Sequence, residues 1–545
     1  MTGGDRRGAL GVALLLVVLA APAGGGPGRE RPPGGEPGGE SPEPGGESPE
    51  PEPENPAPAA VACGGDVLCS AEVAAIVEAA AAALAVDTLT VGVVDRLGNP
   101  LAVFRQPSAT GADDDRALGL ARTAAWFSHD QAPLSSRTVR FLSGIHFPPG
   151  IARTPNAPLY GIETTNRGCG LDAALNAGAA LAEGRSLAGV VGNLPCRPFD
   201  TTGCGPGVVT GKADVFDSDA RAVDPGGVPI FRPAGAGGPA RLVGGVGVAG
   251  ASGLEAEFAA FTGAFGGATA AVPQFPLPPP GNVFIDGVRL PFVEQTRRPR
   301  GTAPGSPAGG YALGPLDGAA APEGYLVGPL DGTQLSAAEV ARIVAQSVAA
   351  AERARAVIRL PAGQRTRMVV AVADLDGSIL ALFRMSDATV FSLDVAAAKA
   401  RNVVYFSGSP AASADLPGVP AGTAVTNRTI SFGAQPLYPP GIERTPAGPF
   451  FDLFLADAAH PCSQGAEPAH AKQSGVVFFP GSLPLYRGAD LAGGLGVSGD
   501  GVEQDDYVCF RGAAGFEPPD AIWADRVFVR GVRLPFLKFP RRPEG

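Results

Sequence analysis

The sequence predicts an α+β fold in which two tandem domains each carry an antiparallel sheet covered by helices. The prediction rests on an internal repeat, because residues 91–128, beginning VGVVDRLGNPLAVFR, align without a gap on residues 370–407, beginning VAVADLDGSILALFR. Each segment has the pattern of a strand, a glycine-containing turn, a second strand and an Ala-rich helix. The repeated unit is far longer than the roughly 20–50 residues of a solenoid repeat, so we expect two complete globular domains.

Three further blocks recur in the same order and extend the two copies to residues 61–300 and 335–545. These blocks are SRTVRFLSGIHFPPGIARTP with NRTISFGAQPLYPPGIERTP, LVGGVGVAG with LAGGLGVSG, and GVRLPFVEQTRRP with GVRLPFLKFPRRP. Inside the first aligned segment, the residues kept in both copies are Asp95, Gly98, Phe104, Arg105, Asp115, Arg122 and Phe127, which recur as Asp374, Gly377, Phe383, Arg384, Asp394, Arg401 and Phe406. Residues kept twice are the first candidates for function.

Each copy is expected to begin with a helix whose N-cap is a serine, Ser70 or Ser336. A hairpin and a second helix follow. The expected helices span 68–85 and 113–127 in the first copy and 335–356 and 392–406 in the second. After a long Pro-rich loop, each copy closes with GGVPIF or GSLPLY, the glycine-rich segment, a third helical stretch and one short strand, VFIDGVRLPF or VFVRGVRLPF.

Three segments lie outside the copies. Residues 1–23 have a cationic start, a short apolar run and a small-residue cleavage site, which predicts a signal peptide and a secreted or periplasmic protein; an uncleaved anchor is the alternative. Residues 24–60 are almost entirely Gly, Pro, Glu and Ser, which predicts a disordered tether. Residues 301–334 contain YALGPLDG and YLVGPLDG within Gly, Pro and Ala, which predicts a linker.

The charge of the chain argues against a nucleic-acid partner. The formal net charge is −11, and eight Glu against one Arg in residues 30–54 supply −7 of it. The folded part is therefore mildly acidic, whereas binding to phosphates requires a basic surface. After removal of the signal peptide no segment is long and apolar enough to span a membrane.

The seven cysteines of an exported chain suggest disulfides with one thiol left over. The expected pairs are Cys63 with Cys69, Cys196 with Cys204, and Cys462 with Cys509. No C-x-x-C pair occurs, so a zinc ribbon or a thioredoxin-like site is not expected.

The second copy carries an ordered set of motifs. They are D-x-x-G from Asp374 to Gly377, the pair Phe383 and Arg384, S-x-D-x-A-x-x-K-A-R from Ser392 to Arg401, and G-G-L-G-V-S-G-x-x-x-E-Q-D from Gly493 to Asp505. In this order they resemble the haem-binding family of extracellular haem-binding and glycolate-operon proteins. The resemblance implies a profilin-like domain, a bound haem or other small molecule, and a tendency to oligomerise. The first copy departs from it, with Leu120 in place of the lysine and LEAEF at 254–258 in place of the E-Q-D stretch.

The resemblance and the repeat together give a set of candidate ligand-binding residues. In the second copy they are Arg384, Arg401, Lys399, Asp394, Gly496, Ser498 and Gly499, and in the first copy Arg105, Arg122 and Asp115. Repeated arginines, which also include Arg137 with Arg428 and Arg153 with Arg444, can hold haem propionates or another small acid bidentately. The alternative is structural pairing with the repeated acids Asp95, Asp374, Asp115 and Asp394.

A haem iron ligand shared by both copies cannot be histidine. The four histidines are His129, His146, His460 and His470, and none of them is repeated. Tyr438 aligns with Phe147, so a shared tyrosine is excluded as well. Haem would therefore be held by ring packing and propionate pairing, or by an axial ligand in one copy only, for which His129 is one candidate against the alternative of a surface or capping histidine.

Both glycine segments, GVGVAG at 245–250 and GLGVSG at 494–499, satisfy G-x-G-x-x-G. A dinucleotide site is disfavoured, because the motif stands near the end of each copy and does not open a βαβ unit. Tight packing of a strand on a helix is the favoured explanation, and anion binding at the start of a helix is the alternative.

We therefore expect an exported protein that binds or senses a small ligand, with haem first, and in which the two copies associate as a pseudo-twofold pair or as a homo-oligomer. Catalysis is disfavoured because no nucleophile elbow, H-E-x-x-H or P-loop occurs. Two alternatives stay open: an enzyme acting on haem or a small organic acid, and a structural domain pair that binds nothing.

Overall fold

The computed structural model describes residues 65–149, 151, 153–162, 224–233, 240–266, 282–459, 463–468, 470 and 472–545. The predicted signal peptide and tether lie outside these residues. We refer to the described residues up to 319 as the first half and to those from 320 onward as the second half. In the part of the chain so described, every helix is too short or too polar to cross a membrane.

Each half contains one five-stranded sheet, and the strand order is the same in both. The first sheet has the order β3-β4-β1-β2-β7 and the second the order β11-β12-β9-β10-β8. All of their pairings are antiparallel. The strands of the first sheet are β1 (Thr90–Asp95), β2 (Pro100–Arg105), β3 (Gly227–Arg232), β4 (Arg241–Ala249) and β7 (Gly310–Leu313). Those of the second are β9 (Val369–Ala373), β10 (Ile379–Arg384), β11 (Ser482–Arg487), β12 (Asp490–Ser498) and β8 (Gly324–Val327).

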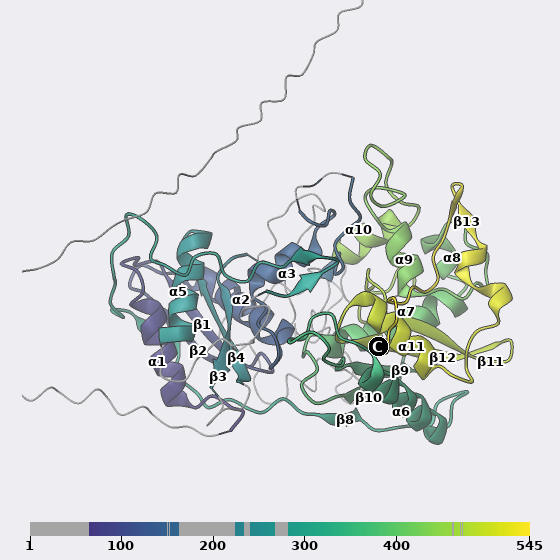
Figure 1. Cartoon of the computed structure of the whole chain (residues 1–545), viewed down its shortest axis with the longest axis horizontal. Helices are drawn as coiled ribbons and strands as arrows, with labels where there is room; N and C mark the ends of the chain where they lie inside the picture. The colour runs from purple at the N-terminus through teal and green to yellow at the C-terminus, as the bar shows by residue number, and fades with distance from the viewer. Residues whose placement is uncertain are drawn as a thin grey trace, which may run out of the picture. The chain divides into compact units, whose positions relative to one another are not determined.

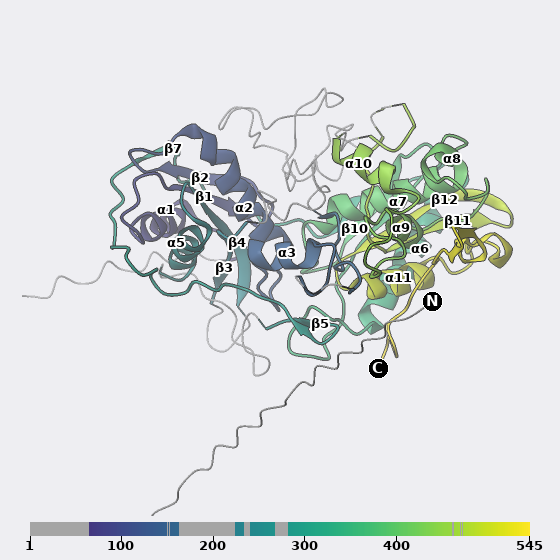
Figure 2. The same cartoon turned by 90° about the horizontal axis from the view of Figure 1, so that it is seen from above.

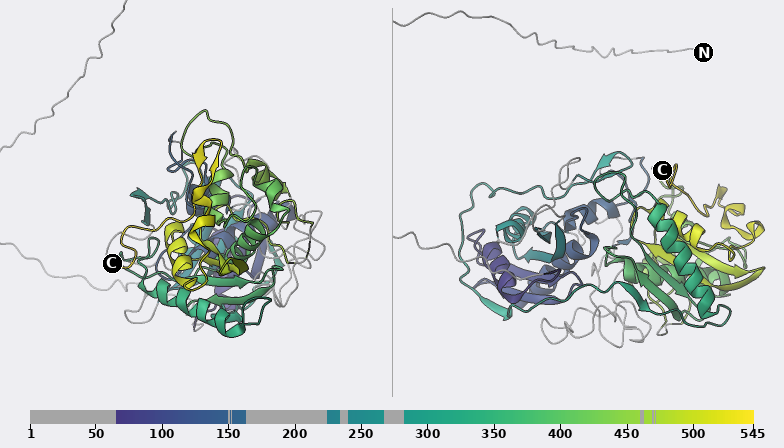
Figure 3. Two further views of the ribbon diagram at one scale, coloured as in Figure 1. Left: turned by 90° about the vertical axis from the view of Figure 1, so that its right-hand side faces the viewer. Right: turned by 60° about the horizontal axis from the view of Figure 1, so that its bottom comes forward.

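Helices cover both faces of each sheet, so the predicted α+β class is confirmed (Figure 1). One face of the first sheet packs against α1 (Ser70–Ala81) and α5 (Gly253–Gly266), and the other against α2 (Asp114–Phe127). In the second half, α6 (Ala337–Arg353) and α11 (Val502–Gly512) pack together, and the long helix α6 lies across the sheet (Figure 3). Helix α7 (Ser392–Gly408) takes the position of α2.

Strand alternation divides the side chains of the first sheet between these two layers. Val91, Val93, Val246 and Val248 are fully buried in one core with α1 and α5. Their neighbours Gly92, Gly245 and Gly247 face α2. Because successive residues of a strand point to opposite faces, the valines form an apolar layer while the glycines leave room for a helix on the other side.

The glycines of β4 and β12 let a helix lie directly on the strand backbone. A Cβ at Gly247 would stand 2.0 Å from the carbonyl oxygen of Ala117, and a Cβ at Gly496 would stand 2.1 Å from that of Ala396. No real Cβ approaches an oxygen so closely, so both positions require glycine. The G-x-G-x-x-G segments are therefore packing surfaces within strands, as favoured from the sequence.

Shorter elements complete each half. The helices are α3 (Ser136–Ser143), α8 (Ala412–Asp415), α9 (Asn427–Gly433) and α10 (Phe451–Ala459), with 3-10 turns η1 (Gly111–Asp113), η6 (Asp520–Ile522) and η7 (Ala524–Arg526). The hairpins are β5 (Phe284–Ile285) with β6 (Val288–Arg289), and β13 (Phe528–Val529) with β14 (Val532–Arg533). The prediction of a single closing strand is thus wrong, because a two-residue turn with positive φ folds each segment into a hairpin outside the main sheet (Figure 2).

Two local predictions need correction at the start of the halves. Cys69, and not Ser70, is the N-cap of α1, whereas Ser336 caps α6 with Glu339 in a capping box, as expected. The predicted linker also forms structure, since β7 pairs with β2 and β8 pairs with β10. Its Gly and Pro content hid the alternating pattern, in which Tyr311 and Tyr325 pack edge-on against Phe104 and Phe383.

The two halves contact each other through Asp387, which has a φ of 59°. Its carboxylate accepts hydrogen bonds from Arg96 (2.6 Å), Arg359 (2.8 Å) and the backbone N–H of Asp130 (3.0 Å). Although burial raises it, Arg359 and Arg96 hold the pKa of Asp387 well below its usual range.

Aromatic stacking and backbone bonds extend this contact. The rings of Phe127 and Phe391 stack at 4.0 Å, and the carbonyl oxygen of Trp126 accepts the N–H of Val390 at 3.1 Å. Residues 126–130 of the first half thus meet 387–391 of the second. The expected pseudo-twofold pair would also bring the aligned residues 405–409 onto 108–112. Tyr405 and Ser409 instead line a pocket, so the contact is head-to-tail and the pseudo-twofold prediction is wrong.

One of the predicted disulfides is also wrong. Cys509 is a free thiol, fully buried in α11, and burial raises its pKa well above the usual value. It therefore does not pair with Cys462. The predicted pairs of Cys63 with Cys69 and of Cys196 with Cys204 involve residues outside the described ranges and stay predictions.

The contact between helix and strand backbone gives a first prediction. Gly496→Ala is expected to lower the free energy of unfolding by about 3 kcal/mol, since α7 must move to admit the new methyl group. Urea denaturation of the full chain measures the change. Gly310→Ala is the control, because a Cβ at that edge position meets nothing within 4 Å. Equal stability of the two variants would show that α7 does not bear on the strand at Gly496.

Candidate functional site

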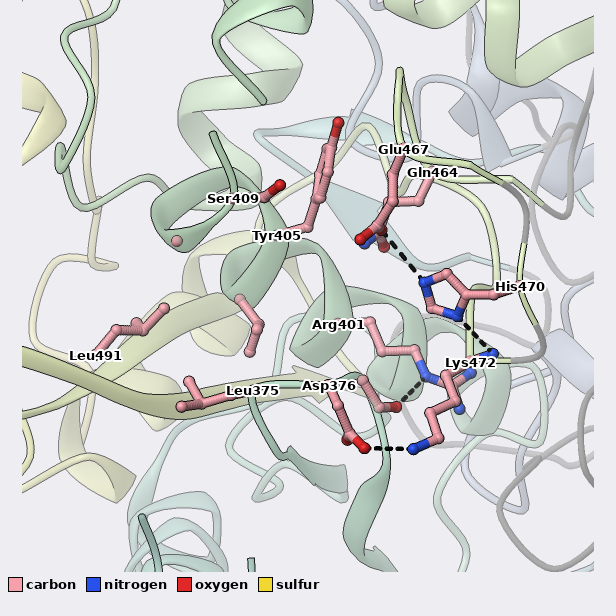
Figure 4. A pocket seen from close by; sticks show the side chains of 13 residues that line it. Leu375, Asp376, Arg401, Tyr405, Ser409, Gln464, Glu467, His470, Lys472 and Leu491 are labelled. Atoms are coloured by element: carbon pink, nitrogen blue, oxygen red, sulfur yellow. Dashed lines mark hydrogen bonds and ion pairs between the residues drawn. The ribbon is translucent and has the colours of Figure 1, made fainter. Parts of the chain in front are cut away.

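A pocket of about 440 Å³ lies in the second half, beside the turn between β9 and β10 (Figure 4). Its volume falls within the range of about 300–1,000 Å³ that is typical of small-molecule sites. Helix α7 supplies one wall, and the segment around residues 464–472 supplies another. The lining residues are Leu375, Asp376, Gly377, Arg401, Val404, Tyr405, Gly408, Ser409, Gln464, Glu467, His470, Lys472 and Leu491.

Arg401 is the predicted ligand-binding residue that lines this pocket. It projects from α7, and its Nε donates to the carbonyl oxygen of Gly377 at 2.8 Å while Nη1 donates to Ser474 Oγ at 3.1 Å. Burial lowers its pKa to about 10, against the opposing effect of Asp394 and Asp376. The guanidinium therefore remains charged at neutral pH and holds the turn at the pocket floor.

The polar wall of the pocket contains two side-chain pairs, Lys472 with Asp376 and His470 with Glu467. Lys472 Nζ donates to the carboxylate of Asp376, and His470 Nε2 lies 3.4 Å from Glu467 Oε2. Although burial raises it, hydrogen bonds from Lys472 and Ser378 lower the pKa of Asp376 to about 2. These pairs are partly exposed, so they contribute little to stability and can exchange partners when a ligand enters.

Tyr405 lines the pocket with its ring while its hydroxyl is held elsewhere. The Oη donates to Asp415 Oδ2 at 2.6 Å, so the phenol points away from Asp376 and Lys472 (Figure 4). Burial, together with this hydrogen bond, raises the pKa of Tyr405 strongly. The residue therefore offers a neutral phenol and an aromatic face at neutral pH.

The repeated pairs Asp115 with Arg122 and Asp394 with Arg401 have the same environment in both halves. Arg122 Nε donates to the carbonyl oxygen of Gly98 at 2.9 Å, as Arg401 does to Gly377. Burial lowers the pKa of Arg122 to about 10 and raises that of Asp115, and Asp394 is raised by burial to about 7. The repeated guanidiniums thus hold the hairpin turns through backbone carbonyl oxygens, whereas the structural alternative named the repeated acids as their partners.

Lys399, Ser498 and the two glycines of the predicted site lie in the packed interior. Lys399 is fully buried between α7 and β12, where Nζ donates to Val497 O at 2.8 Å and to Asp505 Oδ2 at 3.0 Å. Ser498 donates to Ser392 Oγ at 3.0 Å. Gly496 lies under α7 and Gly499 against the backbone of Arg367. None of these four residues lines the pocket.

The other predicted arginines are also engaged with the protein. Arg384 is fully buried and donates to the carbonyl oxygens of Ala388 and Pro322. Burial lowers its pKa to about 9. Arg105 is bound bidentately to Asp114. This geometry favours the structural alternative for both residues, and their role in ligand binding stays an untested prediction.

A further repeated pair shows the same structural use. Arg137 pairs with Glu257 at 2.7 Å, and Arg428 pairs with Asp506 at 2.5 Å. Glu257 and Asp506 occupy aligned positions in the two copies. The repeat therefore preserves an ion pair between the α3 or α9 segment and the third helix.

His129 and His470 lie in different environments. His129 is fully buried at the contact between the halves, where burial and then the charge of Arg359 lower its pKa, so it is neither a surface histidine nor open to a ligand. His470 lines the pocket. His470, Tyr405, Lys472, Asp376 and Glu467 were not selected as site residues from the sequence, because the selection followed the repeat and the family motifs, and these five residues belong to neither. The sequence feature that could have indicated this site is the pair His470 and Lys472, which lies before β11 and is not repeated in the first copy.

The pocket can bind a small, partly apolar molecule that carries a carboxylate. Arg401 and Lys472 supply positive charge, Tyr405 and Leu491 supply apolar surface, and His470 supplies an imidazole. Among the described side chains, no group of three or more His, Cys, Asp or Glu is arranged to hold a metal ion. An imidazole beside cationic and apolar side chains matches the donor set that holds haem in other proteins.

Comparisons with known proteins agree with the predicted resemblance in the second half. Residues 335–514 match the family described as haem degrading protein HbpS-like, and no curated protein matches the chain significantly. A solved structure described as the PduOC:heme complex is 24% identical to this chain. The match covers 34% of this chain and 96% of the solved chain, with a TM-score of 0.23. Klebsiella pneumoniae protein ORFY is 19% identical, covers 35% and 97%, and has a TM-score of 0.23.

The buried ion pair of Lys399 and Asp505 gives a second prediction. The aligned residues in the first half are Leu120 and Ala256, so the chain itself contains an apolar version of the pair. Lys399→Leu or Asp505→Ala alone is expected to cost about 3–5 kcal/mol, because each leaves a buried charge unpaired. In the double variant the two costs should not add, with a coupling of about 2–3 kcal/mol in urea denaturation. Strict additivity would mean that the two charges do not stabilise each other.

The raised pKa of Asp394 gives a third prediction. The native carboxyl titrates at about 7, whereas an unfolded Asp titrates near about 4, so the native state binds more protons between these values. Stability should therefore be full below about pH 4 and fall as the pH rises to about 7. In Asp394→Asn the fall of the urea midpoint from about pH 4.5 to about pH 7.5 should be smaller than in the native chain. Asp490→Asn, at an exposed position of β12, is the control and should keep the native dependence.

Proposed function

We propose, from the premise that residues 335–514 form an HbpS-like domain, that this chain binds haem in the pocket beside α7. The observation that carries the proposal is the meeting of His470, Arg401 and Lys472 with the apolar side chains of one pocket in the matched segment. An imidazole, two cations and an apolar wall are the groups that bind a planar tetrapyrrole with acidic side chains.

The residues present fit this ligand in type. Haem would supply an iron centre that can be held by an imidazole, and His470 is the pocket residue that would provide one. Its Nδ1 accepts the backbone N–H of Lys472 at 3.2 Å, and its Nε2 lies 3.4 Å from Glu467 Oε2, so both neighbours orient the ring. Arg401 and Lys472 would hold the propionates.

The proposal includes a duplicated pair of domains and a location outside the cytoplasm. The two sheets of identical strand order support a duplicated pair of domains, and the apolar leader and acidic tether in the sequence support a secreted or periplasmic location. A protein with this organisation would bind or sense haem outside the cytoplasm.

The second candidate is an enzyme that degrades haem, which the description of the matched family favours. Binding alone and degradation differ in one measurement. A binding protein keeps the Soret band when a reductant and oxygen are added to the haem complex, whereas a degrading enzyme loses it with turnover of excess haemin.

Haemin titration of the full chain, followed by absorption, gives a fourth prediction. His470→Ala is expected to weaken binding about tenfold or more and to change the Soret spectrum, because the imidazole of the pocket is removed. His146→Ala is the matched control. Its Nε2 lies 3.2 Å from Glu443, much as that of His470 lies 3.4 Å from Glu467, yet His146 lies outside the pocket lining.

Two outcomes would contradict the proposal. If His146→Ala weakens haemin binding as much as His470→Ala does, the pocket is not the site. If the native chain shows no saturable binding, the structural alternative of a domain pair without a ligand is favoured instead.

A further inference from the structure

The pocket of the second half has a counterpart surface on the first half. In the aligned segments, Leu375, Tyr405 and Ser409 of the pocket correspond to Arg96, Trp126 and Asp130. Leu491 of the pocket corresponds to Leu242 in the repeated glycine block. The two surfaces therefore occupy the same place in the repeated fold, at the end of α7 and of α2 beside the hairpin turn.

Trp126 fills this place in the first half. Its indole lies so close to the turn that a Cβ at Gly98 would stand 2.6 Å from Cζ2 and Nε1 of the ring. In the second half, the Tyr405 hydroxyl is bonded to Asp415, so the ring is turned away from Asp376 and Lys472 (Figure 4). The backbone of Lys472 lies over the turn instead, since a Cβ at Gly377 would stand 2.8 Å from its carbonyl oxygen. The aligned ring thus lies over the turn in the first half and away from it in the second, where the pocket opens beside Arg401 and Lys472.

Residues of the second half then cover the filled surface. Asp387 binds Arg96 and the N–H of Asp130, and Phe391 stacks on Phe127. Arg359 adds a hydrogen bond of 2.9 Å to Gln131. We call the segments 359–364 and 387–391 the plug. In its chemistry the plug presents a carboxylate next to a planar ring, which is also what a haem propionate edge presents.

We propose that the pocket and the plugged surface are one site used in two ways: in the second half it admits a small ligand, and in the first half it is permanently filled by the chain itself. The chain therefore binds one ligand and not two. The statement about stoichiometry rests on the proposed function, whereas the statement about the plug does not.

The first half carries no plug of its own. Ser108 and Ala112 stand where the second half has Asp387 and Phe391. The connection that carries Arg359 runs from residue 354 to 368, whereas its counterpart runs only from 82 to 89. A second copy of this chain therefore cannot close the pocket in the way that the second half closes the first, and the pocket stays free for a small molecule.

Exchange of single residues between the halves tests the inference. Tyr405→Trp places the residue of the first half in the pocket and is expected to weaken haemin binding by at least about tenfold. Tyr438→Phe is the matched control, because it also exchanges an aromatic residue for the aligned residue of the first half, Phe147, at a position outside the pocket lining. Its affinity should stay within about threefold of the native chain. The native chain should bind one equivalent of haemin. Two equivalents, or full affinity in Tyr405→Trp, would overturn the proposal.

A second measurement needs no ligand. Trp126 and Trp523 are the two tryptophans of the chain, so Trp523→Phe leaves the fluorescence of Trp126 alone. Acrylamide should quench it weakly, and more strongly after Asp387→Lys, with Phe391→Ala as a milder variant and far-UV circular dichroism as the check on folding. Equal quenching in all three folded proteins would show that the plug does not cover this surface. If haemin binds nowhere, the proposed function fails, and the quenching still decides whether the plug is correct.

Discussion

The direct contact of a helix with the glycines of a central strand is the constraint on which each half is built. Gly245 and Gly247 receive α2, and the aligned Gly494 and Gly496 receive α7, each with a carbonyl oxygen about where a Cβ would stand. At this separation the repeated arginine in the middle of the helix reaches the turn of the neighbouring hairpin. The position of the pocket follows, because it is bounded by that helix, that arginine and that turn.

Much of the fold could be predicted because it depends on local pattern. Strand alternation, turn glycines and Ala-rich helices gave the sheet and its covering helices, and the repeat gave them twice. The edge strands β7 and β8 were missed, since a pairing partner far along the chain decides whether a short Gly-rich and Pro-rich segment becomes a strand. The buried thiol of Cys509 was missed for a similar reason, because spacing along the sequence does not reveal burial.

The candidate site was predicted less well, and the reason is physical. Residues kept in both halves turned out to hold turns and helices together, as with Arg122 and Arg401 on the hairpin carbonyls and with Arg137 and Arg428 on the third helix. Both halves must fold, so selection for folding acts on both copies of such residues. Under the proposed function, ligand binding would need only one copy, so part of its residues would lie where the halves differ, as with Tyr405 against Trp126.

Buried charges in this chain occur together with their partners, both inside the second half and at the contact between the halves. The second half has the ion pair of Lys399 and Asp505 where the first half has the apolar residues Leu120 and Ala256. Both residues differ together, so neither half contains a buried charge without its partner at this place. The largely buried carboxylate of Asp387 likewise accepts hydrogen bonds from both halves. Arg96 and the backbone N–H of Asp130 donate from the first half, and Arg359 donates from the second, so the cost of burying this charge is offset. Separation of the halves would remove the bonds from Arg96 and the Asp130 N–H and keep the one from Arg359, so the first two hydrogen bonds favour the docked arrangement.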